Sequence, residues 1–427
     1  MLDMNKMVMP MYSFREQFLR KPFCKGEGIV LTDVEGKQYL DCISGIWNVP
    51  FGYHNEHVID KIREQLERLP FSNLYVSAAD ITVEYADRLL EKLDGDFQKL
   101  VYTCSGSEST ELAIKFCRKY QKLIGTERTV IGAFNYSYHG TTFGAMSISG
   151  VDKELVKDYY PLVPNINWVD ILKVSDENEW KNKISKFFED YKDVLAGIIV
   201  EPVMGSGGVV EVKREILQFM KEQCEKNNIL LVFDEVATGF GRTGKMFAYQ
   251  HSQVKPDIMC ISKAVNNGYL PMGCVLLGKR VTDIFTSKGE FIEHFSTQNG
   301  NPVACAGALA VLDFMKETLF DEIESKGLYL EKELLKQIQS RKIVFEIRRK
   351  GMMLAIDIKD SNAGEYLHEE ILEKVLRNCY KRGVIIHPFY NPNQNSGIML
   401  YPAFVSSYEQ LEEMAKKISK TLNKMFN

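Results

Sequence analysis

Apolar residues in the middle of the chain form short continuous runs, and segments with helical spacing separate these runs. Strands that are apolar on both faces and alternate with helices are typical of a mostly parallel, buried sheet. The predicted strands are 99–104, 128–134, 195–203, 229–233, 258–263 and 273–278. Apolar residues recur every three to four positions in 108–123 and 214–227, which predicts helices there.

The two ends of the chain differ from this pattern. Two short apolar runs flank a Glu-Gly turn in 28–45, which predicts small β-strands, and 57–69 has helical spacing. After about residue 305 helical patterns dominate, with short strands predicted at 347–358 and 383–388.

From these patterns we expect an α/β fold in which the N-terminal strands have no sheet of their own and pack with the C-terminal lobe. The expected parts are an N-terminal segment (1–60), a large domain (61–305) and a small α+β domain (306–427).

Composition and charge exclude several classes of protein. The chain has 427 residues, of which 45% are hydrophobic and 26% charged, as in ordinary globular proteins. Its net charge of -4 gives no indication of a nucleic-acid partner, and no apolar stretch is long enough to span a bilayer. Nine dispersed cysteines and an N-terminus without an apolar signal core predict a cytoplasmic protein with reduced thiols. The seven histidines form no paired metal motif, so we expect no metal.

Ligands of an open α/β sheet bind where the strands end. The strand 99–104 runs into Gly106 and Ser107 at the start of a helix, whose free N–H groups could bind an anion or simply be capped. The strand 229–233 ends in Asp234, and a carboxylate there requires a cationic or hydrogen-bonding partner. It could equally be a helix cap or part of a structural ion pair.

Two further segments follow strands. YSYHGTT contributes Tyr138 and His139, and an aromatic ring there could stack on a flat ligand or pack within the protein. CISKAVNNGYLPMG contributes Lys263, which is either a surface lysine or an amine that bonds a carbonyl group. GFGRTG (239–244) fits a dinucleotide fingerprint, but its acidic residues precede the glycines and no helix pattern follows, so we predict a loop.

An anion cradle, a strand-end aspartate, an aromatic residue and a lysine together form the set that pyridoxal phosphate requires. The phosphate binds at a helix N-terminus, and a carboxylate keeps the pyridine nitrogen protonated. The aldehyde forms a Schiff base with a lysine.

Six ordered motifs make the chain resemble the class III pyridoxal-phosphate-dependent aminotransferases of fold type I over nearly its whole length, closest to the ω-amine transaminase branch. The motifs are SGSESTELAIKFCRKY (105–120), SYHGTTFGAMS (137–147), IIVEPVMGSGG (198–208), LVFDEVATGFGRTGKMFA (231–248), PDIMCISKAVNNGYLPMG (256–273) and STQNGNPVACA (296–306). The resemblance implies a homodimer with shared active sites. It also implies ping-pong transfer of an amino group from an amine donor to a keto or aldehyde acceptor.

The resemblance also implies roles around the cofactor ring. Lys263 would be the Schiff-base lysine and Asp234 the partner of the pyridinium nitrogen. Val236 and Tyr138 would press the two faces of the ring.

Other implied roles concern the phosphate and the pocket. Gly106 and Ser107 would hold the phosphate, and Thr297 would reach the phosphate of the neighbouring subunit. Glu201 would be a structural acid near the ring, and Trp47 would match a pocket aromatic of the ω-amine branch.

The sequence departs from the family pattern at three positions. Ser206 stands where several members that use glutamate and 2-oxoglutarate have a glutamate, and Met399 stands where they have a carboxylate-binding arginine. Ala237 replaces a glutamine near the phenolic oxygen of the cofactor. An arginine is the natural clamp for a carboxylate, so its absence favours terminal amines, ω-amino compounds or a larger carrier-like substrate.

Two alternative functions remain open from the sequence. An epimerase, decarboxylase or aminomutase of the same fold would share Lys263 and Asp234 but need no separate acceptor. A non-catalytic pyridoxal-phosphate-binding regulator usually has an added DNA-binding domain, and no basic helix-turn-helix segment is visible at either end.

Overall fold

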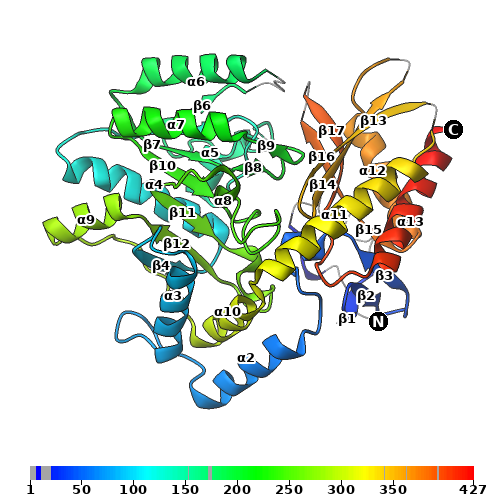
Figure 1. Cartoon of the computed structure of the whole chain (residues 1–427), viewed down its shortest axis with the longest axis horizontal. Coiled ribbons are helices and arrows are strands. Elements are labelled where there is room, and N and C mark those ends of the chain that lie inside the picture. The colour runs from blue at the N-terminus through cyan, green and yellow to red at the C-terminus, as the bar shows by residue number, and fades with distance from the viewer. Residues whose placement is uncertain are drawn as a thin grey trace.

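The computed structural model describes residues 6–10, 21–151, 153–171, 176–340, 342–361, 363–391 and 394–427. A seven-stranded sheet forms its centre (Figure 1). In spatial order the strands are β4 (Lys99–Thr103), β12 (Gly273–Leu277), β11 (Ile258–Ile261), β10 (Leu230–Asp234), β7 (Leu195–Val200), β5 (Val130–Phe134) and β6 (Ile166–Val169). The predicted mostly parallel sheet is confirmed, with β12 antiparallel to both of its neighbours.

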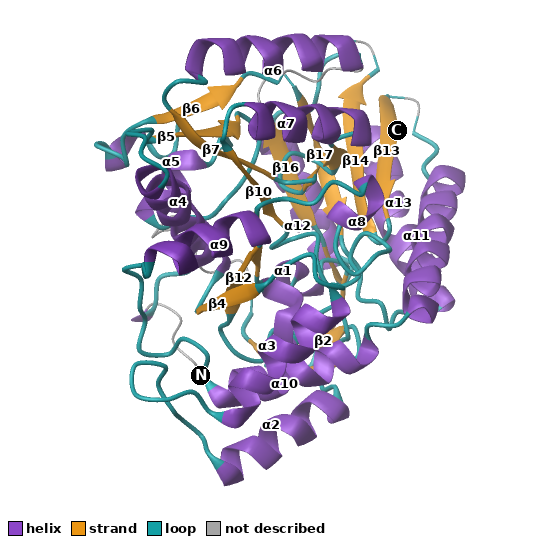
Figure 2. Ribbon diagram, turned by 60° about the vertical axis from the view of Figure 1, so that its left-hand side comes forward, coloured by secondary structure: helices purple, strands orange, loops and turns teal. Residues whose placement is uncertain are grey.

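The sheet is buried on both faces because its strands are apolar at consecutive positions. In β10, Leu230 and Val232 belong to one apolar cluster, whereas Leu231 and Phe233 belong to another. The first cluster contains side chains of α4 (Gly106–Leu123) and the second contains side chains of α7 (Arg214–Lys226). Successive side chains of a strand point to opposite faces, so these two helices cover opposite sides of the sheet (Figure 2).

A second, four-stranded antiparallel sheet lies in the C-terminal part of the chain. Its strands are β13 (Ile343–Lys350), β14 (Met353–Asp360), β17 (Asn395–Leu400) and β16 (His387–Asn391), and its neighbouring helices are α11 (Glu317–Gln337), α12 (Glu369–Lys381) and α13 (Tyr408–Phe426). The sequence predicted short strands at 347–358, but the structure has a hairpin of two longer strands. Gly351, with φ +57°, occupies its turn.

The N-terminal strands pair with the C-terminal part of the chain. β1 (Phe23–Glu27), β2 (Val30–Asp33) and β3 (Gln38–Asp41) form an antiparallel series, and β3 pairs in parallel with β15 (Val384–Ile385). Figure 1 shows these blue strands beside the orange and red C-terminal elements. The division of the chain into domains at residues 60 and 305 stays a prediction.

The remaining elements connect these sheets. They are α1 (Ser44–Trp47), α2 (Glu56–Arg68), α3 (Asp80–Lys92), α5 (Phe143–Ile148), η3 (Lys157–Tyr159), α6 (Glu177–Tyr191), β8 (Val203–Met204), β9 (Val210–Glu211), α8 (Tyr249–Ser252), η4 (Lys263–Asn266), α9 (Lys279–Lys288) and α10 (Pro302–Phe314). Of the helices in the described ranges, none has both the length and the apolar character needed to cross a membrane.

The sheet topology brings the candidate residues together. The strands β4, β11, β10, β7 and β5 run in the same direction, so their carboxyl ends meet at one edge of the sheet. The loops after them begin at Cys104, Ser262, Glu235, Glu201 and Asn135.

Candidate active site

Asp234 is the last residue of β10, and its buried carboxylate is held on both oxygens. Oδ2 lies 2.7 Å from Nδ1 of the buried His139, and Oδ1 accepts a 3.0 Å hydrogen bond from the Val236 amide. The sequence predicted a cationic or hydrogen-bonding partner for Asp234, but that partner was not identified as His139. The His139-Gly140 pair, which follows the predicted strand 128–134, was the feature of the sequence that could have identified this partner. The His139 Nε2 atom is buried and has no partner among the described residues.

Glu201 follows the strand next to Asp234, because Val200 of β7 pairs with Phe233 of β10. It is buried and accepts hydrogen bonds from the backbone amides of Tyr138, at 2.9 Å, and Gly205, at 3.0 Å. Burial raises the pKa of Glu201 to about 7, and the negative charge of Asp234 acts in the same direction. Glu201 therefore fixes the loop that contains Tyr138.

Lys263 begins a short 3-10 turn directly after β11, and its backbone is in the left-handed region at φ +46°. Its Nζ lies 4.4 Å from the ring centroid of Trp47. Burial lowers the pKa of the Lys263 amine, although the charges of Asp234 and Glu201 act in the opposite direction. A lysine with a lowered pKa provides the neutral amine that attack on a carbonyl requires.

The helix α4 begins at Gly106, two residues earlier than the pattern predicted. Ser105 caps it by accepting a 3.2 Å hydrogen bond from the Glu108 amide. The Ser107 hydroxyl accepts a 3.2 Å hydrogen bond from the Thr141 amide. A Cβ atom at Gly140 would lie 2.1 Å from Ser107 Oγ, so only glycine permits this close approach. The helix start and the 140–141 loop thus form one cradle with N–H groups for an anion.

Trp47 forms an aromatic wall together with a residue from the other end of the chain. Its ring stacks on Tyr401 with centroids 4.5 Å apart and planes at 22°. The four residues of α1, Ser44 to Trp47, have left-handed φ values between +47° and +68°, so this short element is a left-handed turn. This conformation costs about 1–2 kcal/mol for each residue other than glycine, so the surrounding structure must impose it.

Arg242 lies behind this wall and is fully buried. Its guanidinium donates to the carbonyl oxygens of Pro402, at 2.6 Å, and Met352, at 3.3 Å, and burial lowers its pKa to about 9. Its Cζ lies 5.9 Å from the Tyr401 ring centroid. The GFGRTG segment is a series of turns, as predicted. Its arginine connects the segments of Met352 and Pro402 inside the protein, a role that the sequence pattern did not predict.

Two of the three positions that depart from the family pattern, Met399 and Ala237, pack in the same wall. Met399 is 1% exposed and belongs to one apolar cluster with Trp47, Tyr401 and Ala237. Arg348, on β13 of the same sheet as Met399, makes two hydrogen bonds to Asp357, at 2.6 and 2.7 Å. The Met399 position therefore presents thioether and aromatic surface rather than a guanidinium group.

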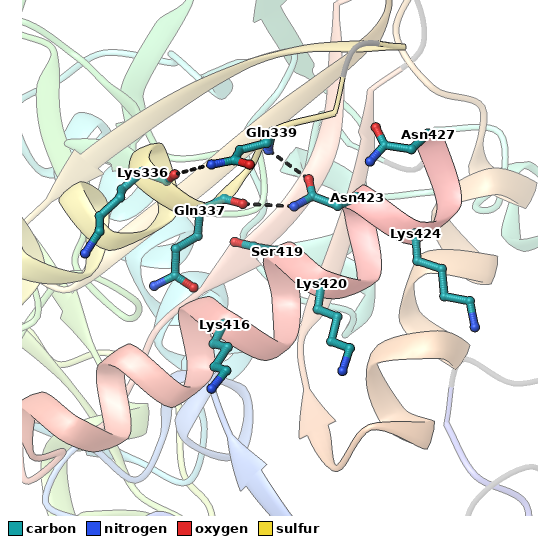
Figure 3. A pocket seen from close by; sticks show the side chains of 9 residues that line it. All are labelled: Lys336, Gln337, Gln339, Lys416, Ser419, Lys420, Asn423, Lys424 and Asn427. Atoms are coloured by element: carbon teal, nitrogen blue, oxygen red, sulfur yellow. Dashed lines mark hydrogen bonds between the residues drawn. The ribbon is translucent and has the colours of Figure 1, made fainter.

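A cavity of about 370 Å³ opens at Lys263, within the size range of ligand pockets of about 300–1,000 Å³. Gly45, Ile46, Ser105 and Ser262 are among its lining residues. A larger groove of about 620 Å³ lies between α11 and α13 (Figure 3). Among the described residues its lining contains Lys336, Lys416, Lys420 and Lys424 but no acidic or aromatic side chain, so it lacks the groups that the chemistry needs.

The predicted site residues have distinct positions in the structure. Gly106, Ser107, Tyr138, Val236 and Lys263 are all half-buried, as expected for side chains around a cavity. A Cβ at Gly106 would lie only 2.8 Å from Val236 Cγ1, so the helix start directly contacts this residue.

Thr297 is exposed in the loop before α10. The remaining groups fit pyridoxal phosphate. Asp234 supplies a carboxylate held by His139, α4 supplies an anion cradle, and Lys263 supplies an amine with a lowered pKa.

Comparisons with known proteins agree with this geometry. The family model "Aminotransferase class-III" matches residues 13–422. An adenosylmethionine-8-amino-7-oxononanoate aminotransferase of Staphylococcus aureus is 30% identical over 94% of this chain and 92% of its own. An acetylornithine aminotransferase of Aquifex aeolicus is 34% identical over 84% of this chain and 88% of its own. The structure of an (S)-enantioselective omega-transaminase from Thermomicrobium roseum has a TM-score of 0.90 and 31% identity over 98% of this chain and 96% of its own.

Proposed function

The chain belongs to the class III aminotransferases, which use pyridoxal phosphate, and from this premise we propose that its donor is a terminal amine or an ω-amino compound. In this proposal a keto or aldehyde compound is the acceptor, and the two half-reactions follow a ping-pong mechanism. The observation that supports the donor class is the buried Met399, which packs with Trp47 and Tyr401 where a carboxylate-binding arginine would stand.

The proposal gives each residue at the sheet edge a task. Pyridoxal phosphate, when bound, supplies an aldehyde that bonds amines and a ring that accepts an electron pair. Asp234, oriented by His139, would keep a proton on the ring nitrogen, and Lys263 Nζ would move a proton between the donor carbon and the cofactor. Val236 and Tyr138 would enclose the ring from its two faces.

Phosphate binding, by the same proposal, uses the N–H groups of Gly106 and Ser107 at the start of α4. Glu201 supports the site through the Tyr138 amide and does not contact substrate. Trp47 provides the apolar wall on which the donor packs.

We also propose a homodimer in which Thr297 reaches the phosphate of the partner subunit. The loop that contains Thr297 also exposes Phe291, at 68%, and Phe295, at 55%. Phe295 contacts Tyr75, with ring centroids 6.0 Å apart, and Tyr75 is 85% exposed. Exposed apolar side chains that gather around one loop are typical of an interface. The proposal places the enzyme in the cytoplasm, where its nine free thiols would stay reduced.

Single-turnover spectroscopy tests the donor class. The purified protein loaded with pyridoxal phosphate is mixed, without acceptor, with ω-amines, diamines, glutamate, acetylornithine and adenosylmethionine. We expect terminal amines to convert the yellow cofactor to pyridoxamine phosphate once per active site, after which the reaction stops. Lys263→Ala is the negative control because it removes the amine that moves the proton.

Two results would contradict the proposal in different ways. A faster conversion by glutamate than by every terminal amine would refute the donor class but leave transamination intact. Continuous consumption of a compound while the cofactor stays yellow would refute transamination. It would favour an epimerase, decarboxylase or aminomutase.

A further inference from the structure

Asp41, at the end of β3, is a second buried strand-end carboxylate, and it lies outside the catalytic group. Its Oδ1 accepts a 3.0 Å hydrogen bond from the Ile43 amide. Its Oδ2 accepts 2.7 Å hydrogen bonds from the Gly45 amide and from the Tyr53 hydroxyl. Asp41 therefore connects two loops, one of which is the turn that ends in Trp47.

The turn from Ser44 to Trp47 is held in a conformation that its own side chains disfavour. Ile46, at φ +61°, is β-branched, and Trp47, at φ +68°, is bulky, and both side chains favour negative φ. The Ser44 hydroxyl donates to the Tyr401 carbonyl at 2.6 Å, which attaches one end of the turn to the C-terminal part of the chain. Asp41 holds the middle of the turn through the Gly45 amide.

The position of this turn decides what the cavity presents to a substrate. Trp47 lies between the Lys263 amine, 4.4 Å from its ring centroid, and Tyr401. Ile46, which is 54% exposed, lines the cavity. If the turn relaxed to right-handed φ values, both side chains would leave these positions.

We propose that Asp41 is a positioning residue for substrate selection, which holds the left-handed turn so that Ile46 lines the cavity and the Trp47 ring stays beside the Lys263 amine. This inference rests on the proposed function in one respect, namely that the donor amine binds beside these two side chains. The position of Trp47 itself does not depend on which donor is used.

Asp33 offers a matched control in the same small sheet. It is 2% exposed, as Asp41 is, and it also accepts two backbone amides and one tyrosine hydroxyl. Its partners are Glu35 and Lys37 in the turn between β2 and β3 and Tyr39 on β3, none of which is among the residues that line the cavity. Asp33→Asn therefore removes a carboxylate with the same kinds of hydrogen-bond partner without touching the Trp47 turn.

The test compares Asp41→Asn with Asp33→Asn by two readouts. Acrylamide quenching of Trp47 fluorescence is measured in a background with Trp168→Phe and Trp180→Phe, which leaves Trp47 as the only tryptophan. We expect Asp41→Asn to raise the quenching constant severalfold and Asp33→Asn to leave it unchanged. In the holoenzyme, Asp41→Asn should lower kcat/KM for the donor amine about tenfold or more, chiefly by raising KM.

Each outcome decides one question. Equal effects of both substitutions on quenching and KM would overturn the proposal, because Asp41 would then act on stability alone. Unchanged quenching in Asp41→Asn would also overturn it. If that variant does not fold, Tyr53→Phe removes a single hydrogen bond to Oδ2 and should raise quenching and KM in the same direction by less. Altered quenching in a protein that transaminates no amine would support the positioning role and refute the proposed function.

Discussion

Replacing Gly106 with alanine tests whether the start of α4 and Val236 together bound the cofactor site. The added Cβ would lie 2.8 Å from Val236 Cγ1 and 3.1 Å from Cγ2. Carbon atoms in contact are comfortable at about 3.5–4.0 Å, so Val236 must move by about 0.7 Å or more. The Val236 amide donates to Asp234 Oδ1, so this movement also disturbs the carboxylate.

Two effects of this substitution on stability oppose each other. Alanine is favoured over glycine in a helix by about 0.5–1 kcal/mol, whereas overpacking costs about 1–3 kcal/mol. We therefore expect the free energy of unfolding of the cofactor-free protein to fall by about 0–2.5 kcal/mol. The affinity for pyridoxal phosphate should fall about 10- to 100-fold, because the displaced Val236 enters the space of the ring.

The assay has two parts and one control. Absorbance titration of the cofactor-free protein with pyridoxal phosphate gives the Kd, and urea unfolding gives the stability. Gly307→Ala in α10 is the control, since its Cβ would lie 3.3 Å from Ile62 Cδ1, 3.4 Å from Asn266 Cβ and 3.5 Å from Ile62 Cγ1, and should leave the Kd unchanged. Wild-type affinity in a folded Gly106→Ala protein would refute the placement of Val236 against the ring.

Three further predictions concern groups around the same edge of the sheet. Burial raises the pKa of Glu201 from an ordinary 4.5 to about 7, so the folded protein binds this proton more tightly than the unfolded chain. The free energy of unfolding therefore falls as the pH rises through this range. Urea unfolding at pH 5 and pH 8 measures this fall, which should be smaller by up to about 3 kcal/mol in Glu201→Gln than in the wild type. The same fall in both proteins would contradict the prediction. Gly140→Ala, with φ +122° and a clash at Ser107 Oγ, should lower the unfolding midpoint more than Gly125→Ala, where φ is +84° and nothing lies within 4 Å; equal losses would mean that the cradle can open. His139→Asn should slow the amine half-reaction in stopped-flow absorbance by about tenfold or more, since a hydrogen bond to a charged group contributes about 1.5–3 kcal/mol, and an unchanged rate would show that the pair is not needed.

The elements of the central sheet could be predicted because their signals are local. Continuous apolar runs such as 229–233 and helical spacing such as 214–227 follow from the geometry of a buried strand and an amphipathic helix. The strand-end position of Asp234 and the place of Lys263 after an apolar run were visible in the same way. Their roles came from the family resemblance, because a lone aspartate or lysine has several structural uses.

The direction of β12 was not determined by the sequence pattern. A buried strand has the same run of apolar residues whether it is parallel or antiparallel, and only the pairing with β4 and β11 decides between them. The Ser105 cap marks the start of α4 at Gly106, and the close approach of Val236 to this glycine joins residues that are far apart in the sequence.

The aromatic wall of Trp47 and Tyr401 depends on tertiary contacts. The stacking of Trp47 on Tyr401 joins residues that are far apart in the chain, and the Ser44 hydroxyl bonds Tyr401 across 357 positions. The left-handed turn before Trp47 contradicts the local preference of Ile46, so no rule of propensity could have found it. Local apolar patterns therefore specify the strands and helices of this chain. Which distant side chains meet follows only from how these elements pack, and those contacts stabilise conformations that the local chain disfavours.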